Sequence, residues 1–388
     1  MSPNFDHVVI LADESANWKI AGLCQLERLV LGLDEFATSI SSQRKIDIFV
    51  FWRPGIASEQ RWQPQNPRLS GCNFVDALSV SGRERVFNTR LLVKRRGLEQ
   101  FVHDSVPLEN DVTIGDESAV WEKLQQQFEN ACANTDQQNN ETWRYLSDDH
   151  DIARGERWLL RGSGKSRDGF VSRWLNRPVS RAVSRLLLKT SITPDAWTWL
   201  ITVFPVIGFL FLTRGDYLGF VTGAALFQVH SILDGCDGEI ARAKYLDSEK
   251  GPGLDALGDL ISLLLFSLGL GFGLYHAMAG SRFGSWIFLT EGFLAFLFIA
   301  ARLGPHTVDL LHRGPAAVAS SEHDESLRAS GGRVFGERFT SLAFELTKRD
   351  VVFLTFLVLA AVGLAQSSLH LLFVYSLVTL LLRHNRRA

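Results

Sequence analysis

Cysteine is scarce in this sequence, with four in 388 residues, and no two of them form a CxxC pair. This usage argues against a disulfide framework or a zinc cluster and is typical of a protein from a reducing compartment. Net charge is also nearly absent, because 40 Lys and Arg residues balance 42 Asp and Glu residues. Such a balance argues against a protein whose main task is to coat nucleic acid. Hydrophobic residues make up 46% of the chain, which is too many for global disorder.

Charge is missing altogether from long stretches of the second half. The stretches are Ala196–Thr213, Tyr217–Leu233, Leu260–Ser281 and Val351–Leu382, while Phe283–Ala301 carries only Glu291. A polar turn at Gln366–Ser368 divides the last stretch into two, and a helix needs about 20 apolar residues to cross a bilayer. We therefore expect an all-α transmembrane bundle of six spans. A large soluble helical core is the weaker alternative, because soluble helices carry a polar face.

Lys and Arg are distributed unevenly between the loops that would connect these spans. Only Arg214 and Arg282 lie in the three short loops of one side, whereas the other side holds the N-terminal half and the basic C-terminal tail. The positive-inside rule then places both termini in the cytosol. The first 30 residues lack the basic and apolar regions of a signal peptide, in agreement with a cytosolic N-terminal half.

The N-terminal half has the pattern of a small α/β domain. His7–Leu11 and Lys45–Trp52 are typical of buried strands, and Ile20–Leu33 between them has helical periodicity. This order predicts a parallel sheet. Residues 134–167 contain polar, Gly/Ser-rich and basic stretches that are typical of a linker. We thus expect an α/β domain over residues 1–133, a linker over 134–167 and a membrane domain over 168–388.

A basic residue recurs at every fourth position at the start of the membrane domain. The series consists of Arg173, Arg177, Arg181, Arg185 and Lys189. On a helix this spacing makes one stripe. The pattern predicts an interfacial helix at about residues 168–190, whose stripe meets anionic headgroups or an anionic substrate. A merely solvated helix face is the alternative.

Four aspartates carry the chemistry that the sequence suggests. Asp234 and Asp237 share one helix face, and Asp255 and Asp259 share a face of the next helix. Residues 251–253, Gly-Pro-Gly, break the backbone between them, so that the two pairs can face each other. Carboxylates near membrane depth are costly and are usually functional. Four converging carboxylates suit Mg²⁺ or Mn²⁺, and two such ions can clamp a diphosphate. Solvated loop acids are the weaker alternative.

The residues around these acids match a known pattern. The series Asp234-x2-Asp237-Gly238-x2-Ala241-Arg242-x8-Gly251-x3-Asp255-x3-Asp259 resembles, without a gap, the signature of the CDP-alcohol phosphatidyltransferases. The resemblance extends from about Asp168 to the C-terminus. It implies that a CDP-linked alcohol donates its phospho-alcohol group to an acceptor hydroxyl and that CMP leaves. It also implies a homodimer in the cell membrane of a prokaryote.

The same resemblance assigns roles to residues. Metal ligands would be Asp234, Asp237, Asp255 and Asp259, and Asp259 would also be the general base on the acceptor hydroxyl. The donor would be bound by Asp234, Gly238, Ala241, Arg242, Gly251 and Thr198. A carboxylate near a hydroxyl can take its proton, and Arg242 can meet a phosphate, so both roles are physically reasonable.

Two further segments resemble the inositol-phosphate branch of this family, which includes di-myo-inositol phosphate phosphate synthases. Residues 168–180 and 192–195 are similar to its entry region, although Asp195 stands where Asn is more common. Lys348, Arg349 and Asp350 resemble its acceptor-phosphate site, which Arg177 would complete. Cations that only follow the positive-inside rule are the alternative. The acceptor implied is a polyol phosphate such as inositol phosphate.

The N-terminal domain resembles the nucleotidyltransferase that is fused to such synthases in bifunctional inositol-1-phosphate cytidylyltransferase/synthases, and residues 87–98 resemble a later segment of it. An active enzyme of this type has a glycine-rich loop after its first strand. Ala12–Ala21 contains no glycine and presents Asp13 and Glu14 where phosphates would approach. We therefore expect a degenerate domain that is structural, regulatory or a docking site for a separate cytidylyltransferase.

Several alternatives stay open. The donor is either CDP-inositol or CDP-diacylglycerol, and a phospholipid synthase with another alcohol acceptor fits the same motif. A membrane transporter and a non-catalytic scaffold are alternatives of a different class. A transporter would require polar groups along several spans, whereas these acids cluster at one depth. A scaffold would have little use for four costly carboxylates.

Overall fold

The computed structural model describes residues 7–40, 45–62, 69, 72–75, 85–95, 97–98, 101, 117–133, 142–161, 169–279, 282–314 and 348–384. The chain divides into two compact units. The first comprises Met1–Ser163 together with Leu188–Thr190 and Arg242–Tyr245, and the second comprises the remaining residues.

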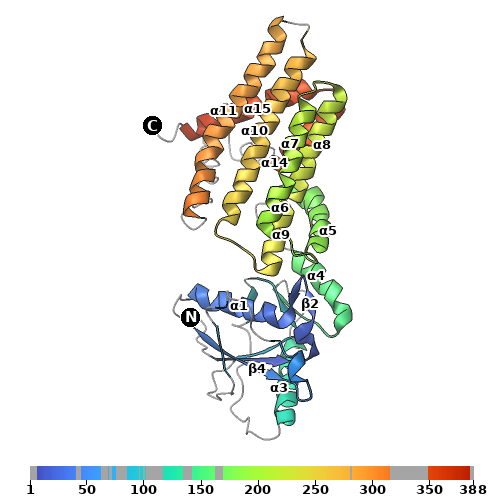
Figure 1. Cartoon of the computed structure of the whole chain (residues 1–388), viewed down its shortest axis with the longest axis vertical. Helices are drawn as coiled ribbons and strands as arrows, with labels where there is room; N and C mark the ends of the chain where they lie inside the picture. The colour runs from blue at the N-terminus through green and yellow to red at the C-terminus, as the bar shows by residue number, and fades with distance from the viewer. Residues whose placement is uncertain are drawn as a thin grey trace. The chain divides into compact units, whose positions relative to one another are not determined.

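A four-stranded parallel sheet forms the centre of the first unit (Figure 1). It consists of β1 (His7–Ala12), β4 (Ile46–Trp52), β5 (Cys72–Phe74) and β6 (Arg85–Asn88), in the order β5-β4-β1-β6. All three strand pairs are parallel. The central strand β1 is apolar and buried almost throughout, as a strand covered on both faces should be. The predicted α/β region with a parallel sheet is thus confirmed.

The helix predicted from Ile20 begins later than expected. Ala21 and Gly22 have φ angles of +48° and +81°, which a helix cannot accommodate. They form the turn between the two short strands β2 (Lys19–Ile20) and β3 (Leu23–Cys24), and α1 (Gln25–Ile40) follows. The apolar periodicity continues through the turn because Ile20 and Ala21 are both buried in the core.

Part of the predicted linker is folded instead. The remaining elements of the first unit are η1 (Glu14–Asn17), η2 (Ser58–Gln60), β7 (Leu91–Val93), α3 (Glu117–Ala133), β8 (Trp143–Tyr145), η3 (Asp149–Asp151) and α4 (Ile152–Leu160). Strand β8 pairs with β7, and Trp143, Trp158 and Leu160 are buried. This burial of large apolar side chains explains why residues 142–161 fold with the first unit. Residues 134–141 and 162–167 of the predicted linker lie outside the described residues.

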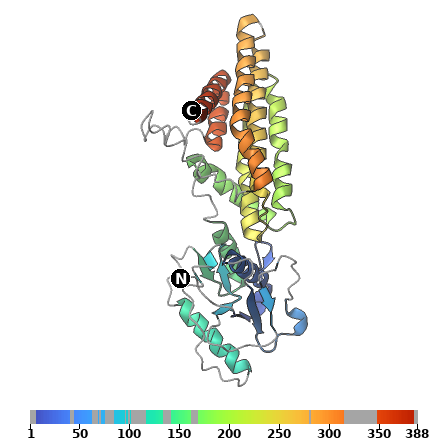
Figure 2. The same cartoon turned by 90° about the vertical axis from the view of Figure 1, so that its left-hand side faces the viewer.

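The second unit is helical. Its elements are the π-helical turn η4 (Ser172–Asn176), α5 (Arg177–Leu187), α6 (Pro194–Ile201), α7 (Val203–Leu212), α8 (Tyr217–Leu233), α9 (Gly235–Lys244), α10 (Gly251–Ala277), α11 (Arg282–Arg313), α14 (Arg349–Ala361) and α15 (Ala365–His384). The long helices α10 and α11 run side by side (Figure 2). Phe227, Phe266 and Phe353 form the centre of its core, with ring centroids 4.9–5.5 Å apart.

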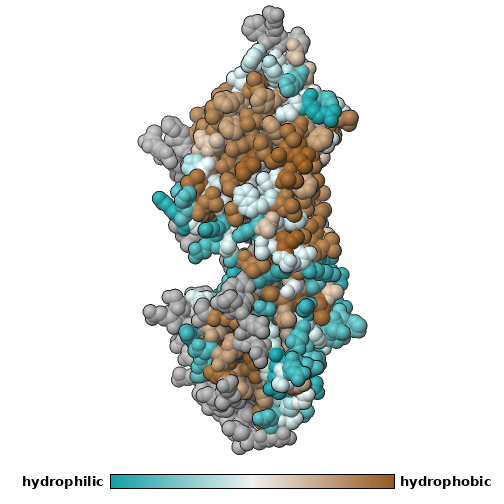
Figure 3. Space-filling model, viewed as in Figure 1, coloured by the Kyte–Doolittle hydropathy of each residue, from teal (hydrophilic) through white to brown (hydrophobic). Residues whose placement is uncertain are grey.

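Three segments among the described residues are long and apolar enough to cross a membrane, namely Pro194–Leu212, Gly251–Ala277 and Ser285–Arg313. Apolar residues also dominate the face of the helical unit that is seen in Figure 3. Helix α8 has 17 residues, α14 has 13 and the apolar part of α15 is Ala365–Leu381. The structure thus supports a membrane protein with three candidate spans, and the count of six stays a prediction.

The predicted interfacial segment forms η4 and α5. Phe170, Trp174 and Leu186 are all more than 65% exposed, as expected for side chains that meet a membrane surface. Arg177, however, is only 8% exposed and turns into the protein. The basic stripe is therefore not uniform, because one of its members belongs to the interior.

Candidate functional site

Three of the four predicted aspartates come together. Asp234 ends α8, Asp237 lies in the first turn of α9, and Asp255 lies in the second turn of α10. One carboxylate oxygen from each lies within 4.8 Å of the other two. The two helices turn back on each other through residues 245–250, where Tyr245 has a φ of +53°. The sequence placed this break at Gly251-Pro252-Gly253, but these residues form the first turn of α10, because a proline is tolerated at the start of a helix. Three hard oxygen ligands in this arrangement suit Mg²⁺ or Mn²⁺.

Asp237 accepts two hydrogen bonds from its surroundings. Thr198 Oγ1 donates a hydrogen bond of 2.8 Å to its Oδ2, and the backbone N–H of Gly238 donates to its Oδ1 at 2.5 Å. Helix α9 lies outside the three candidate spans. Burial and the neighbouring carboxylates of Asp234 and Asp255 raise the pKa of Asp237 to about 7. Crowded carboxylates of this kind are relieved by a cation, so these residues fit the metal that the sequence implies.

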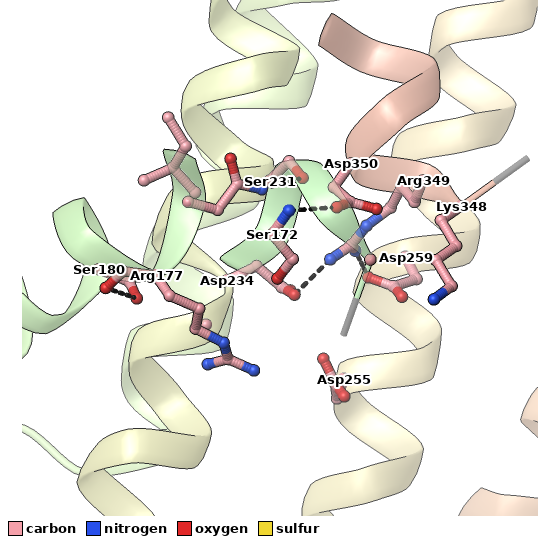
Figure 4. Close-up of a pocket in the computed structure, with 14 residues that line it drawn as sticks. Ser172, Arg177, Ser180, Ser231, Asp234, Asp255, Asp259, Lys348, Arg349 and Asp350 are labelled. Atoms are coloured by element: carbon pink, nitrogen blue, oxygen red, sulfur yellow. Dashed lines mark hydrogen bonds and ion pairs between the residues drawn. The ribbon is translucent and has the colours of Figure 1, made fainter. Parts of the chain in front are cut away.

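Asp259 occupies a different place from the other three acids. It lies one turn beyond Asp255 on α10 and forms an ion pair with Arg349 at the start of α14. The same guanidinium pairs with Asp234, so Arg349 bridges carboxylates from two helices (Figure 4). The prediction that all four acids bind metal stays a prediction, and the geometry supports it most strongly for Asp234, Asp237 and Asp255.

A cavity of about 310 Å³ opens beside these acids. The predicted acceptor residues Arg177, Lys348, Arg349 and Asp350 line it together with Asp234, Asp255 and Asp259. The backbone N–H of Ser172 donates a hydrogen bond of 2.6 Å to the carboxylate of Asp350 (Figure 4). Asp350 therefore fastens the start of α14 to η4. The cavity combines cations for an anionic substrate with acids for a metal.

Two of the predicted donor residues, Thr198 and Gly238, contact the acid cluster. Thr198 contacts Asp237 directly, as described above. Gly238, Ala241 and Arg242 follow Asp237 on α9, where Arg242 belongs to the first compact unit, and Gly251 is the first residue of α10. Gly238, Ala241, Gly251 and Thr198 are not among the described residues that line the 310 Å³ cavity. Their role in donor binding stays a prediction.

Sequence reasoning missed Glu239, which occupies an unspecified position of the motif. Its side chain is fully buried, and its Oε1 lies 3.2 Å from Arg177 Nη1 and 3.0 Å from Ser180 Oγ. A glutamate next to Gly238 on a buried helix face was the available signal, because a buried carboxylate needs a partner. The partner could not be read from the sequence, since Arg177 is 62 residues away.

The carboxyl end of β1 in the first unit is occupied by the chain's own ion pair. Asp13 is 2% exposed and caps η1 by accepting from the N–H of Ser15 at 2.8 Å. Its other oxygen lies 2.8 Å from Arg90 Nε, and Arg90 Nη2 lies 2.9 Å from Glu14 Oε1. The two acids that directly follow β1 are therefore both paired with Arg90 within the chain.

Comparison with known proteins gives a consistent result. Residues 191–317 match the CDP-alcohol phosphatidyltransferase family. The chain is 34% identical over 132 residues to a "Bifunctional IPC transferase and DIPP synthase" of Archaeoglobus fulgidus, covering 33% of this chain and 25% of that protein. A protein of the same description from Rubrobacter xylanophilus is 35% identical over 148 residues, covering 36% and 33%. The chain thus spans a quarter to a third of the length of these relatives.

Proposed function

Because the C-terminal part of this chain is a CDP-alcohol phosphatidyltransferase domain, we propose that the protein is a metal-dependent CDP-alcohol phosphotransferase. It moves a phospho-alcohol group from a CDP-linked donor to a hydroxyl of a polyol phosphate such as inositol phosphate. The observation that carries this proposal is the convergence of Asp234, Asp237 and Asp255 at the edge of a cavity that also holds cations. A diphosphate and a phosphate are both anionic, which matches this pairing of metal ligands and guanidinium groups.

In the proposed reaction, the acceptor oxygen forms a bond to the β-phosphorus of the donor and the bond to the CMP oxygen breaks. Asp259 takes the proton of the acceptor hydroxyl, because its carboxylate lines the cavity beside Arg349. Arg349 orients Asp259 through their ion pair. Two bound Mg²⁺ ions would supply charge neutralisation of the diphosphate and of the leaving oxygen, with Asp259 completing the ligand set of the other three acids.

The acceptor lies between the two cationic walls of the cavity. Lys348 and Arg349 start α14 and Arg177 starts α5, and all three line the space. An arginine can hold a phosphate in bidentate fashion, whereas an uncharged polyol gains little from these groups. A phosphorylated acceptor is therefore favoured over a free polyol.

The test is an assay of CMP release by the purified full chain in detergent with Mg²⁺. CDP-inositol and CDP-diacylglycerol are supplied in parallel, each with inositol phosphate, free inositol or glycerol phosphate. We expect release with inositol phosphate, and Asp259→Asn should abolish it while nucleotide binding is retained. Release that persists in Asp259→Asn contradicts the role of this residue, and release only with an unphosphorylated acceptor contradicts the proposed acceptor class.

For the first unit we propose a degenerate nucleotidyltransferase-like domain without cytidylyltransferase activity. The ion pair of Asp13 and Arg90 supports this, because side chains of the protein itself occupy the end of β1 and Ala12–Ala21 contains no glycine. The full chain given CTP and inositol phosphate should therefore form no pyrophosphate. Pyrophosphate above the level of a heat-treated sample would contradict the proposal. The domain would then have a structural or regulatory role, or would serve as a docking site for a separate cytidylyltransferase.

The apolar spans and the basic loops also bear on where the protein lies in the cell. We propose an integral protein of a prokaryotic cell membrane with both termini in the cytosol, and a homodimer as its assembly. The three candidate spans support the membrane location, and the uneven distribution of Lys and Arg supports the orientation. Protease access to the termini in sealed vesicles of known orientation tests the topology.

A further inference from the structure

Arg177 and Glu239 form a buried ion pair at one wall of the cavity. Arg177 Nη1 lies 3.2 Å from Glu239 Oε1, and the two side chains are 9% and 0% exposed. Arg177 lines the cavity, whereas Glu239 is not among the described residues that line it. The arginine thus stands at the wall, and its carboxylate partner stands behind it.

The surroundings of Glu239 are arranged around this contact. Ser180 Oγ donates a hydrogen bond of 3.0 Å to the same Oε1 that Arg177 approaches. The second oxygen, Oε2, is buried and has no hydrogen-bond partner in the described part of the chain. A buried carboxylate so poorly compensated is costly, and replacing such a pair by apolar residues often stabilises a protein. Stability alone therefore gives a weak reason for a glutamate here.

The backbone of α9 leaves room for the arginine to reach its partner. A Cβ atom on Gly235 would lie 3.1 Å from Arg177 Nη1 and 3.4 Å from Ser180 Oγ. The guanidinium of Arg177 therefore packs against the backbone of α9 at Gly235, where the helix has no side chain. Gly235 directly follows Asp234, so the charge of Arg177 is held one residue from the acid cluster.

We propose that Glu239 is a positioning residue that holds Arg177 at the cavity wall to receive the phosphate of the acceptor. The inference rests on the proposed function for the nature of the acceptor. An unsupported arginine side chain must give up several rotamers when it binds an anion, whereas a guanidinium fixed by a carboxylate behind it has already done so. Ser180 Oγ, which contacts the same Glu239 oxygen, also lies 3.3 Å from the backbone carbonyl oxygen of Arg177, so the pair is fixed to the first turn of α5.

The test measures binding separately from turnover. Isothermal titration of the purified full chain in detergent gives the Kd of myo-inositol phosphate and of free myo-inositol. We expect Glu239→Gln to raise the Kd of the phosphorylated ligand about tenfold, the size expected for losing a charge-assisted contact, and to leave that of free inositol unchanged. Glu249→Gln, which removes an exposed acid near the start of α10, is the matched control and should change neither value.

A double-mutant cycle separates positioning from general support of the fold. If Glu239 acts through Arg177, then Glu239→Gln added to Arg177→Gln should weaken binding by less than twofold beyond Arg177→Gln alone. The double variant buries no unpaired charge, so it stays interpretable if Arg177→Gln alone fails to fold. In that event its Kd is compared with that of Glu239→Gln. A double variant that binds the phosphorylated ligand at least as weakly as Glu239→Gln supports the coupling, and one that recovers the wild-type Kd overturns it.

Other outcomes are distinct. Equal loss of affinity for inositol and inositol phosphate, or an unchanged Kd in Glu239→Gln, overturns the positioning role. Absence of measurable inositol phosphate binding to the wild-type chain overturns it as well. If the wild-type chain binds inositol phosphate but releases no CMP, and Glu239→Gln selectively weakens that binding, the proposed function is contradicted and the positioning role is supported.

Discussion

Thr198 Oγ1 donates a 2.8 Å hydrogen bond to Asp237 Oδ2 and thereby ties α6 to the acid cluster. The same hydroxyl lies 3.2 Å from the carbonyl oxygen of Pro194, one turn earlier in α6. The hydroxyl is thus held by its own helix as well as by Asp237 of α9. This contact fixes one oxygen of Asp237 and orients the carboxylate toward Asp234 and Asp255. Groups that orient a metal ligand in this way commonly influence metal affinity.

Replacing this hydroxyl should weaken metal binding without removing a ligand. Thr198→Val keeps the shape of the side chain and leaves the carboxylate without its donor, so the Mg²⁺ concentration for half-maximal CMP release should rise about tenfold. Thr198→Ser retains the hydroxyl and should stay within about twofold of the wild type. Equal Mg²⁺ dependence of the Val and Ser variants would contradict a role for this hydrogen bond.

The raised pKa of Asp237 predicts a pH dependence of stability in the chelated protein. The folded value of about 7 lies above the ordinary value of 3.8, so the folded state holds a proton that the unfolded state releases earlier. The contribution of Asp237 to the free energy of unfolding is therefore greatest below about pH 4 and is lost as the pH rises through about 7. The melting temperature in EDTA should therefore fall between pH 5 and pH 7.5, and Asp237→Asn should show a smaller fall.

Metal binding should show the opposite dependence, because protons compete with the cation for the same oxygen. Mg²⁺ should raise the melting temperature more at pH 8 than at pH 6. An equal effect at both values would contradict the assignment of Asp237 as a ligand with a raised pKa.

Gly235 should be sensitive to a single methyl group. Gly235→Ala places a Cβ 3.1 Å from Arg177 Nη1, so the guanidinium must give way by a few tenths of an ångström and its contact with Glu239 is strained. We expect weaker binding of inositol phosphate, by less than the about tenfold that loss of the charged contact itself should cause. Gly304→Ala on α11 is the matched control, because a Cβ there meets nothing within 4 Å. Identical affinities in the two variants would contradict the proposed path of the arginine.

The close approach of α10 and α11 predicts a second glycine effect, this time on stability. A Cβ on Gly292 would lie 2.8 Å from Gly271 Cα and 2.9 Å from the carbonyl oxygen of Ser267, both backbone atoms. Gly292→Ala must therefore separate the helices and should cost about 1–3 kcal/mol, as overpacking does. Thermal unfolding in detergent checks this against Gly304→Ala, and a melting temperature no lower than in that control would show that the helices can separate freely.

Much of this arrangement follows from local sequence. Apolar runs identified β1 and β4, and the spacing of Asp255 and Asp259 placed them correctly on one helix, α10. Asp234 and Asp237 were expected on one helix face, but Asp234 ends α8 and Asp237 belongs to α9. The start of α1 was missed, since the left-handed backbone at Ala21 is set by a hairpin turn. The folding of residues 142–161 was missed because β8 finds its partner in β7, about 50 residues earlier.

The bridging position of Arg349 could not have been predicted. It joins Asp234, 115 residues away, to Asp259 through tertiary packing that no local pattern encodes. The sequence motif identified the acids and the basic residues as separate groups. Their convergence on one cavity depends on how η4, α10 and α14 pack together, and that is information from the fold.

The central claim is that Asp234, Asp237 and Asp255 hold the metal ions that permit transfer from a CDP-linked donor. It is tested most directly by CMP release from CDP-inositol and CDP-diacylglycerol, with inositol phosphate, by the purified full chain with and without Mg²⁺. The account predicts Mg²⁺-dependent release by the wild type, its loss in Asp255→Asn, and normal release in Asp309→Asn, which removes an exposed acid of α11. Release that is independent of divalent metal, or that Asp255→Asn retains in full, would contradict the account.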